Sequence, residues 1–169
     1  MKNYTVIGTP IKHSISPKIH NYWFNMKKIE AIYNKAELIE NDLENFVKKI
    51  KNKEIDGANV TAPFKEKIIP FLDKLSDEAK EANSVNTIYL SGNDVMGHNT
   101  DIAGFYLSLE KRKKEFQNKS ALLLGSGGVA PSIIIALKRL GIDNIFVSNR
   151  TIEKAYNLKK RFQYLNIIE

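Results

Sequence analysis

The sequence predicts an α/β protein built from two domains, the second of them incomplete. Three observations support this fold class. Short runs rich in β-branched residues alternate with segments whose apolar residues recur at helical spacing. A hairpin-type connection joins two of the runs and adds an antiparallel pair to a mostly parallel sheet. A glycine-rich turn later joins a buried-type strand to a helix, as in nucleotide-binding units. We therefore expect an N-terminal three-layer α/β domain followed by the first part of a Rossmann-type domain.

Strand and helix signals alternate through the first 100 residues. Residues 4–8 form a short β-branched run, which predicts the first strand. Ser16-Pro17 predicts a helix with Ser16 at the N-cap and Pro17 at the first helical position, reaching about Met26. The other expected elements are a strand at 31–36, a helix capped by Asn41 or Asp42, a strand at 56–60, helices at 65–71 and 77–82, and strands at 85–90 and 95–98 joined by residues 91–94.

The second half begins with a helix expected from Asp101 to about Lys114. The elements expected after it are a strand at 120–124, a helix at 128–140 ended by Gly141, a strand at 144–148, and a helix capped by Thr151 that reaches about residue 164. We therefore divide the chain into a domain of residues 1–100, a linking helix at 101–116 and a second domain at 117–169.

The second domain is expected to be truncated. A doubly wound nucleotide-binding sheet has about six strands, and this sequence predicts only the first two. Each missing strand-helix-strand unit needs about 30 residues, so roughly 100 residues are unaccounted for. A two-stranded sheet leaves open edges that invite association, and a homodimer therefore remains an open alternative.

The composition narrows the class of protein. Apolar residues make up 43% of the 169, which is normal for a globular chain. The absence of cysteine excludes disulfides and thiolate metal sites, and it fits a cytoplasmic location. His13 and His20 lack the partners of a metal site, so no metal is expected. The longest apolar stretch, residues 121–137, is too short and too interrupted to span a membrane, and we expect a soluble protein.

The formal charge of +7 raises the alternative of a nucleic-acid-binding protein. Lysine carries nearly all of this charge, and scattered lysines more often form a solvated face than a base or phosphate reader. The one dense run, residues 111–114, lies near an expected helix C-terminus, where cations are favoured. We therefore expect no nucleic-acid partner and no membrane partner. Positive potential would instead attract anionic small molecules.

The glycine-rich turn has the spacing Gly125-x-Gly127-x-x-Ala130 between a strand and a helix. The first glycine permits the tight turn, the second admits a pyrophosphate to the backbone, and the small third residue lets helix and strand pack. The alternative is a tight turn without a ligand. The dinucleotide-contacting residues expected here are Gly125, Ser126, Gly127, Gly128, Val129 and Ala130.

The end of the next strand indicates which dinucleotide binds. An NAD-binding domain usually has an acidic residue about 20 positions after the glycines, whereas residues 148–151 read Ser-Asn-Arg-Thr, with no carboxylate before Glu153. A guanidinium at Arg150 suits the 2′-phosphate of NADP. The alternative for Arg150 is a surface salt bridge. Arg150 is therefore the NADP(H) contact expected at this strand end.

Reactive side chains follow two expected strands of the first domain. Lys65 lies just after the strand that ends at Val60, and Asp101 follows the strand that ends at His98. An amine and a carboxylate at neighbouring strand ends make a plausible proton-transfer pair. The alternatives are an exposed lysine and a helix-capping aspartate. Ser14 and Ser16 precede a helix N-terminus and predict a cradle for a carboxylate, with ordinary capping as the alternative.

Four motifs in order resemble the shikimate dehydrogenase family. They are Ser14-Ile15-Ser16-Pro17, Asn59-Val60-Thr61-Ala62-Pro63-Phe64-Lys65, Asn99-Thr100-Asp101 and Gly125-Ser126-Gly127-Gly128. The resemblance runs from about Tyr4 to Thr151. It implies that Asn149, Arg150 and Thr151 form the family's NADP signature, with Lys154 as an outer contact. It implies NADPH-dependent reduction of 3-dehydroshikimate to shikimate, within chorismate and aromatic amino acid biosynthesis. It also implies that Ser14 and Ser16 hold the substrate carboxylate, that Asn59, Thr61, Lys65, Asn86 and Asp101 surround its ring hydroxyls, and that Lys65 and Asp101 are catalytic.

Two rival functions remain at this point. One is a quinate or broad shikimate/quinate dehydrogenase. The other is a non-catalytic protein that binds shikimate without hydride transfer, which the expected truncation makes credible. Many members of the family have glycine directly after the aspartate, whereas this sequence has Ile102. This departure concerns the backbone geometry after Asp101 and not its carboxylate. The sequence leaves open which of Lys65 and Asp101 moves the proton.

Overall fold

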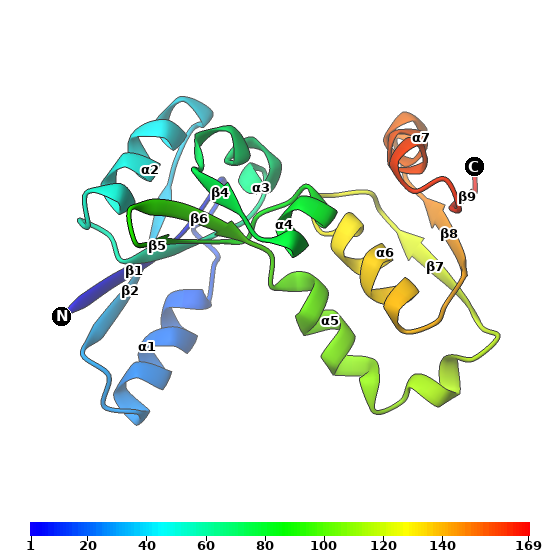
Figure 1. The fold of residues 1–169 in the computed structure, drawn as a ribbon, viewed down its shortest axis with the longest axis horizontal. Coiled ribbons are helices and arrows are strands. Elements are labelled where there is room, and N and C mark those ends of the chain that lie inside the picture. Colours follow the sequence, from blue (N-terminus) through cyan, green and yellow to red (C-terminus); the bar gives the residue numbers. More distant parts are fainter. The chain divides into compact units, whose positions relative to one another are not determined.

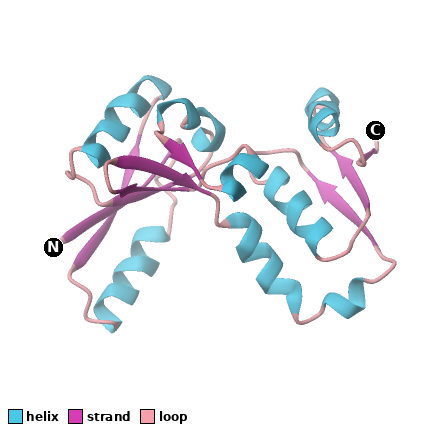
Figure 2. Cartoon of the chain, viewed as in Figure 1, coloured by secondary structure: helices cyan, strands magenta, loops and turns pink.

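The computed structural model describes residues 1–169. It contains two compact units, Met1–Asn99 and Thr100–Glu169. Each unit has its own sheet, with six strands in the first and three in the second. Figure 1 traces both units along the chain, and Figure 2 shows their helices and strands.

The sheet of the first unit has the strand order β2-β1-β3-β5-β6-β4. Its strands are β1 (Lys2–Gly8), β2 (Ala31–Glu37), β3 (Gly57–Val60), β4 (Lys74–Leu75), β5 (Thr87–Ser91) and β6 (Asp94–His98). Strand β1 pairs in parallel with β2 and β3, and β4 pairs in parallel with β6. Strand β5 is antiparallel to β3 and β6, so the expected hairpin is present.

Helices cover both faces of this sheet. They are α1 (Ser16–Met26), α2 (Leu43–Lys51), α3 (Phe64–Lys67) and α4 (Asp77–Ala82), with 3-10 turns at Glu40–Asp42 and Ile69–Phe71. Figure 1 shows α1 on the opposite side of the sheet from α2. Alternation along β1 gives each face its own core, because Ile7 packs with residues of α2 while Val6 packs with Tyr33.

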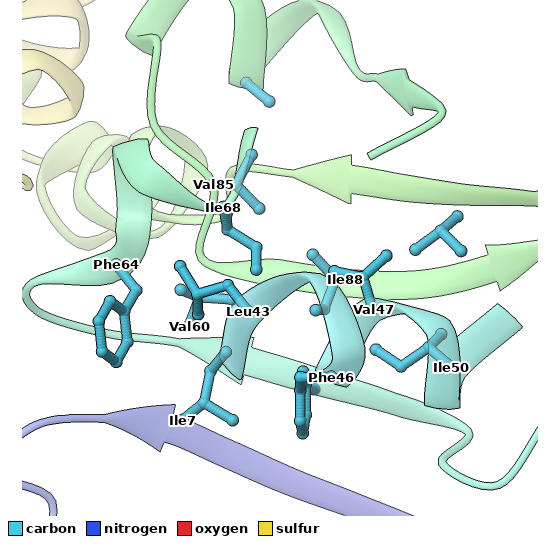
Figure 3. Close-up of a cluster of buried hydrophobic side chains, with 13 residues drawn as sticks. Ile7, Leu43, Phe46, Val47, Ile50, Val60, Phe64, Ile68, Val85 and Ile88 are labelled. Atoms are coloured by element: carbon cyan, nitrogen blue, oxygen red, sulfur yellow. The ribbon is translucent and has the colours of Figure 1, made fainter. Parts of the chain in front are cut away.

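The larger core lies between the sheet and α2 (Figure 3). Leu43, Phe46, Val47 and Ile50 of α2 recur at helical spacing and are all buried. Phe64 and Ile68 close the same core beside α3. The apolar residues whose spacing predicted α2 are therefore the ones that pack it against the sheet.

The second unit is a parallel sheet of order β7-β8-β9. Its elements are α5 (Asp101–Glu110), a 3-10 turn at Lys113–Phe116, β7 (Ser120–Leu124), α6 (Ala130–Arg139), β8 (Asn144–Ser148), α7 (Ile152–Arg161) and β9 (Asn166–Ile167). The expectation of only two strands is wrong, because β9 pairs with β8 at Phe146↔Asn166 and Val147↔Ile167. The predicted α/β class with mostly parallel sheets is confirmed.

Several local predictions are corrected. Ser16 is the first residue of α1 rather than its N-cap; Ile15 holds that position without a side-chain hydrogen bond. The helix expected at 65–71 is two short pieces, because Pro70 lies in a separate 3-10 turn. The linking helix ends at Glu110 and the last helix at Arg161. Strand β4 was not predicted. No helix in the structure combines the length and apolar character that crossing a membrane requires.

Candidate functional site

One edge of the first sheet gathers the segments that carry most of the predicted substrate residues. Strands β1 and β3 are parallel neighbours, so the segments that follow Gly8 and Val60 leave the sheet together. Backbone bonds tie these segments: Thr61 N–H donates to the Ile7 carbonyl at 3.0 Å, and Thr9 N–H donates to the Ala62 carbonyl at 3.2 Å. Gly8 is required by this approach, because a Cβ there would lie 2.6 Å from Cγ2 of Thr61.

The start of β5 and the end of β6 reach the same edge. Asn86, just before β5, links the ends of β3 and β6, because its carbonyl accepts from Val60 N–H at 2.9 Å and its N–H donates to the His98 carbonyl at 3.0 Å. The Lys65 carbonyl accepts from Val85 N–H at 2.8 Å. These backbone hydrogen bonds therefore bring Thr61, Lys65 and Asn86 to one edge of the sheet.

Ser14 and Ser16 lie at the start of α1 and are both half-buried. The Ser14 Oγ accepts from the Ser16 N–H at 3.3 Å, and the Ser14 N–H donates to the Ile11 carbonyl at 3.0 Å. A hydroxyl can donate as well as accept, so the Ser14 Oγ keeps its own proton for a second partner. The two hydroxyls next to a helix N-terminus are suited to a carboxylate.

Asn59 is held by a network that the sequence did not reveal. Its Oδ1 accepts from the Tyr33 hydroxyl at 2.6 Å, and its Nδ2 donates to the Asn86 carbonyl and to Thr87 Oγ1, both at 3.2 Å. Both amide protons and one oxygen lone pair are thus used within the fold. Asn59 consequently links strands β2, β3 and β5, and a direct substrate contact from it remains a prediction.

Tyr33 is itself positioned by α1. His20 stacks on the Tyr33 ring with centroids 4.2 Å apart and an interplanar angle of 6°. Burial raises the pKa of Tyr33 to about 12 and lowers the pKa of His20 below its ordinary value. Both groups are therefore neutral at pH 7, and the tyrosine keeps the proton it donates to Asn59.

Asp101 begins α5, where a carboxylate in the first turn is favoured by the helix dipole. Lys65 belongs to the first unit and Asp101 to the second, and their pairing stays a prediction. Ile102, the departure from the family pattern, is fully buried and so anchors the first turn of α5. Asn99, which ends the first unit, is also fully buried and donates from Nδ2 to the Ser84 carbonyl at 2.8 Å.

A hollow of about 530 Å³ in the second unit adjoins the glycine-rich turn. The residues that line it are Leu124, Gly125, Ser126, Gly127, Ser148, Asn149, Arg150, Thr151 and Lys154. Seven of these were predicted as cofactor contacts, whereas the predicted Gly128, Val129 and Ala130 do not line the hollow. The Ala130 N–H is also occupied, because it donates to the Gly127 carbonyl at 2.8 Å.

The glycine turn has the geometry that its residues predict. Gly125 has φ +107°, a left-handed value that side chains rarely adopt, and its N–H donates to the Ser148 carbonyl at 2.8 Å. A Cβ on Gly127 would meet no atom within 4 Å, so that glycine leaves its backbone open. The Ser126 Oγ is buried with no hydrogen-bond partner, and a phosphate oxygen would satisfy it.

Asn149 joins the two halves of the hollow. Its Oδ1 accepts from the Ser126 N–H at 3.0 Å, and its Nδ2 donates to the Thr151 carbonyl at 2.8 Å. Arg150 and Lys154 bring two cations to the lining, which contains no carboxylate. These residues fit a dinucleotide with an additional phosphate on its ribose.

Comparison with known proteins covers both units. The model of the shikimate dehydrogenase substrate binding domain matches residues 6–88, and the model of shikimate/quinate 5-dehydrogenase matches residues 108–169. Shikimate dehydrogenase (NADP(+)) of Pelagibacter ubique is 54% identical over 168 residues, which are 99% of this chain and 63% of that protein. The counterpart in Aquifex aeolicus is 41% identical over 94% of this chain and 59% of its own length.

Solved structures agree with the sequence relatives. The shikimate dehydrogenase of Aquifex aeolicus has a TM-score of 0.90 at 39% identity and covers this whole chain and 63% of its own. A Thermus thermophilus shikimate 5-dehydrogenase, solved in complex with NADP(H) and shikimate, has a TM-score of 0.86 at 30% identity with the same coverage. The chain spans less than two thirds of the length of these relatives. It belongs to the shikimate dehydrogenase family.

Proposed function

We propose that the chain is the substrate-binding part and the beginning of the cofactor-binding part of an NADP-dependent shikimate dehydrogenase, which reduces 3-dehydroshikimate to shikimate. The observation that carries the proposal is the hollow beside Gly125, with two cations and no carboxylate in its lining. The Thermus thermophilus relative solved with NADP(H) and shikimate supports it over the whole chain. A homodimer and a cytoplasmic location belong to the same proposal.

The substrate is proposed to lie at the edge of the first sheet. The hydroxyls of Ser14 and Ser16 would hold its carboxylate through charge-assisted hydrogen bonds. Thr61, Lys65 and Asn86, which follow β3 or precede β5, would contact its ring oxygens. The Tyr33–Asn59–Thr87 network would hold β2, β3 and β5 in register beneath these contacts.

The cofactor is proposed to occupy the hollow of the second unit. Gly125 and Gly127 would admit the pyrophosphate, Ser126 would donate its free hydroxyl to a phosphate oxygen, and Arg150 would grip the 2′-phosphate. When bound, the reduced nicotinamide supplies the hydride that reaches the C3 carbonyl carbon. The fold of this chain contributes the orientation and the phosphate contacts.

Lys65 is proposed to supply the proton. As an ammonium ion, it would polarise the C3 carbonyl oxygen and then protonate it as the hydride arrives, leaving a neutral amine that solvent reprotonates. Asp101 is proposed to orient the ammonium and to accept a hydrogen bond from the C4 hydroxyl. A carboxylate near an amine favours its charged form, which is the form needed for reduction.

The direct test is spectrophotometric. Shikimate and NADP⁺ should give absorbance at 340 nm with the product of the whole reading frame, while NAD⁺ and quinate should give much slower rates. The same assay on residues 1–169 measures the dehydrogenase activity of this part alone. Quinate turnover equal to that with shikimate would support the broad-specificity rival. Shikimate binding by calorimetry without any turnover, even in the whole product, would favour a non-catalytic binding protein.

A further inference from the structure

A row of polar side chains crosses the first unit's sheet on the face that α1 covers (Figure 1). Tyr33 of β2, Asn59 of β3 and Thr87 of β5 form this row, and the strand register sets Asn59 directly opposite Thr87. The strand neighbours Ala58 and Ile88 belong to the core on the α2 face. Because side chains alternate along a strand, the row lies on the other face. We refer to Tyr33, Asn59 and Thr87 as the polar row.

A backbone carbonyl sets the direction of the hydrogen bonds in the polar row. The carbonyl of Asn86 can only accept, and the end of the Asn59 side chain lies 3.2 Å from it. The atom that faces this carbonyl must be the Asn59 Nδ2, because an oxygen there would bring two acceptors together. Asn59 therefore turns its Oδ1 toward Tyr33, whose hydroxyl donates to it at 2.6 Å.

Thr87 carries this direction on to the side chain of Asn86. The Thr87 Oγ1 accepts from the Asn59 Nδ2 at 3.2 Å, and its own proton is then directed to another acceptor. That acceptor is the Asn86 Oδ1, which lies 3.0 Å from the Thr87 Oγ1. Because an amide carries its oxygen and its nitrogen on opposite sides, the Asn86 Nδ2 faces away from Thr87.

Burial makes the orientation of the Asn86 amide matter. Asn86 is 8% exposed, and its backbone bonds to Val60 and His98 hold it between two strand ends. A rotation of its amide by 180° would set Nδ2 against the Thr87 hydroxyl and would deprive the hydroxyl proton of its acceptor. Polar groups inside a fold are seldom left in that state. The polar row therefore selects one of the two amide orientations.

We propose that Thr87 is a positioning residue, which fixes the Asn86 amide so that Nδ2, and not Oδ1, is presented to the substrate. This inference rests on the proposed function, in which Asn86 contacts a ring oxygen of shikimate. In the fixed orientation Asn86 donates a hydrogen bond, so the substrate atom beside it must be an acceptor. Thr87 thus determines the polarity of the substrate contact without touching the substrate.

Calorimetry of shikimate binding to the product of the whole reading frame tests the role of Thr87. Thr87→Val keeps the β-branched shape but removes the hydroxyl, and it should weaken shikimate binding about 10-fold. Thr87→Ser restores a hydroxyl and should recover most of the affinity. Thr5→Val is the matched control, because Thr5 is a buried threonine of β1 outside the polar row, and it should leave the affinity unchanged. Emission of Trp23, the only tryptophan, checks that each variant is folded.

A double-variant cycle separates action through Asn86 from a general effect on the sheet. Thr87→Val should cost no further shikimate affinity once Asn86→Ala is present. In the dehydrogenase assay, Thr87→Val should raise the KM for shikimate and leave the KM for NADP⁺ unchanged. An unchanged shikimate affinity in Thr87→Val, or an equal loss with and without the Asn86 amide, would overturn the positioning role. A wild-type product that binds no shikimate would overturn the proposed function, and the inference with it.

Discussion

Replacing Tyr33 by phenylalanine isolates the hydroxyl that orients Asn59. The ring is 4% exposed, and phenylalanine preserves both its burial and its stacking on His20. What disappears is one hydrogen bond of 2.6 Å to the Asn59 Oδ1. An interior acceptor that loses its donor costs about 1–3 kcal/mol. With a urea slope of about 1–3 kcal/mol/M, the unfolding midpoint of the first unit should fall by about 1 M.

Trp23 makes the assay specific to the first unit, since no other tryptophan contributes to its emission. Urea unfolding is followed at one fixed protein concentration for Tyr33→Phe, Asn59→Ala and the double variant. Because the two groups contact each other, their coupling energy should exceed about 0.5 kcal/mol. A Tyr33→Phe midpoint equal to the wild type, or fully additive losses in the double variant, would refute the bridging role of this network.

Three further predictions concern acid stability, the cofactor and catalysis. Burial lowers the pKa of His20 in the folded state, so the stability that neutral His20 contributes is fully present above pH 6.5 and is lost as pH falls through the lowered pKa. His20→Phe should therefore flatten the decline of the urea midpoint between pH 7.5 and 5.5. An unchanged slope would contradict this reasoning. Arg150→Ala should weaken NADP⁺ binding about 10- to 100-fold in calorimetry, with little effect on NAD⁺; equal losses would exclude a 2′-phosphate contact. Lys65→Ala in the product of the whole reading frame should lower turnover about 10²- to 10⁴-fold while shikimate still binds; near-normal turnover would remove Lys65 from the mechanism.

The sequence predicted most accurately those elements that begin at a capping side chain or end at a residue with positive φ. Helix α4 has the predicted bounds, Asp77–Ala82, because the Ser76 Oγ caps Ala79 N–H and Asn83 ends the helix with φ +45°. The glycine turn was likewise predicted, since Gly125 adopts the left-handed conformation that favours glycine.

The features that the sequence did not predict depend on tertiary contacts. Strands β4 and β9 have two residues each and exist only through pairing with β6 and β8, so they carry no periodic signal. Tyr33 on β2 reaches Asn59 on β3 across the strand β1 that lies between them. No spacing in the sequence indicates this strand order. The partnerless Ser126 hydroxyl also appears only in the fold, although its position in the glycine turn had indicated a phosphate contact.

An NMR titration of the ¹⁵N-labelled chain with NADP⁺ and, separately, with shikimate would locate both ligands on the protein. We expect NADP⁺ to shift the amide signals of Gly125, Ser126, Gly127, Arg150 and Thr151, with adenosine 2′,5′-bisphosphate acting similarly and 5′-AMP much more weakly. Shikimate should instead shift Ser14, Ser16, Thr61 and Asn86. Absence of shifts at saturating ligand, or the same residues responding to both compounds, would contradict the assignment of separate cofactor and substrate sites.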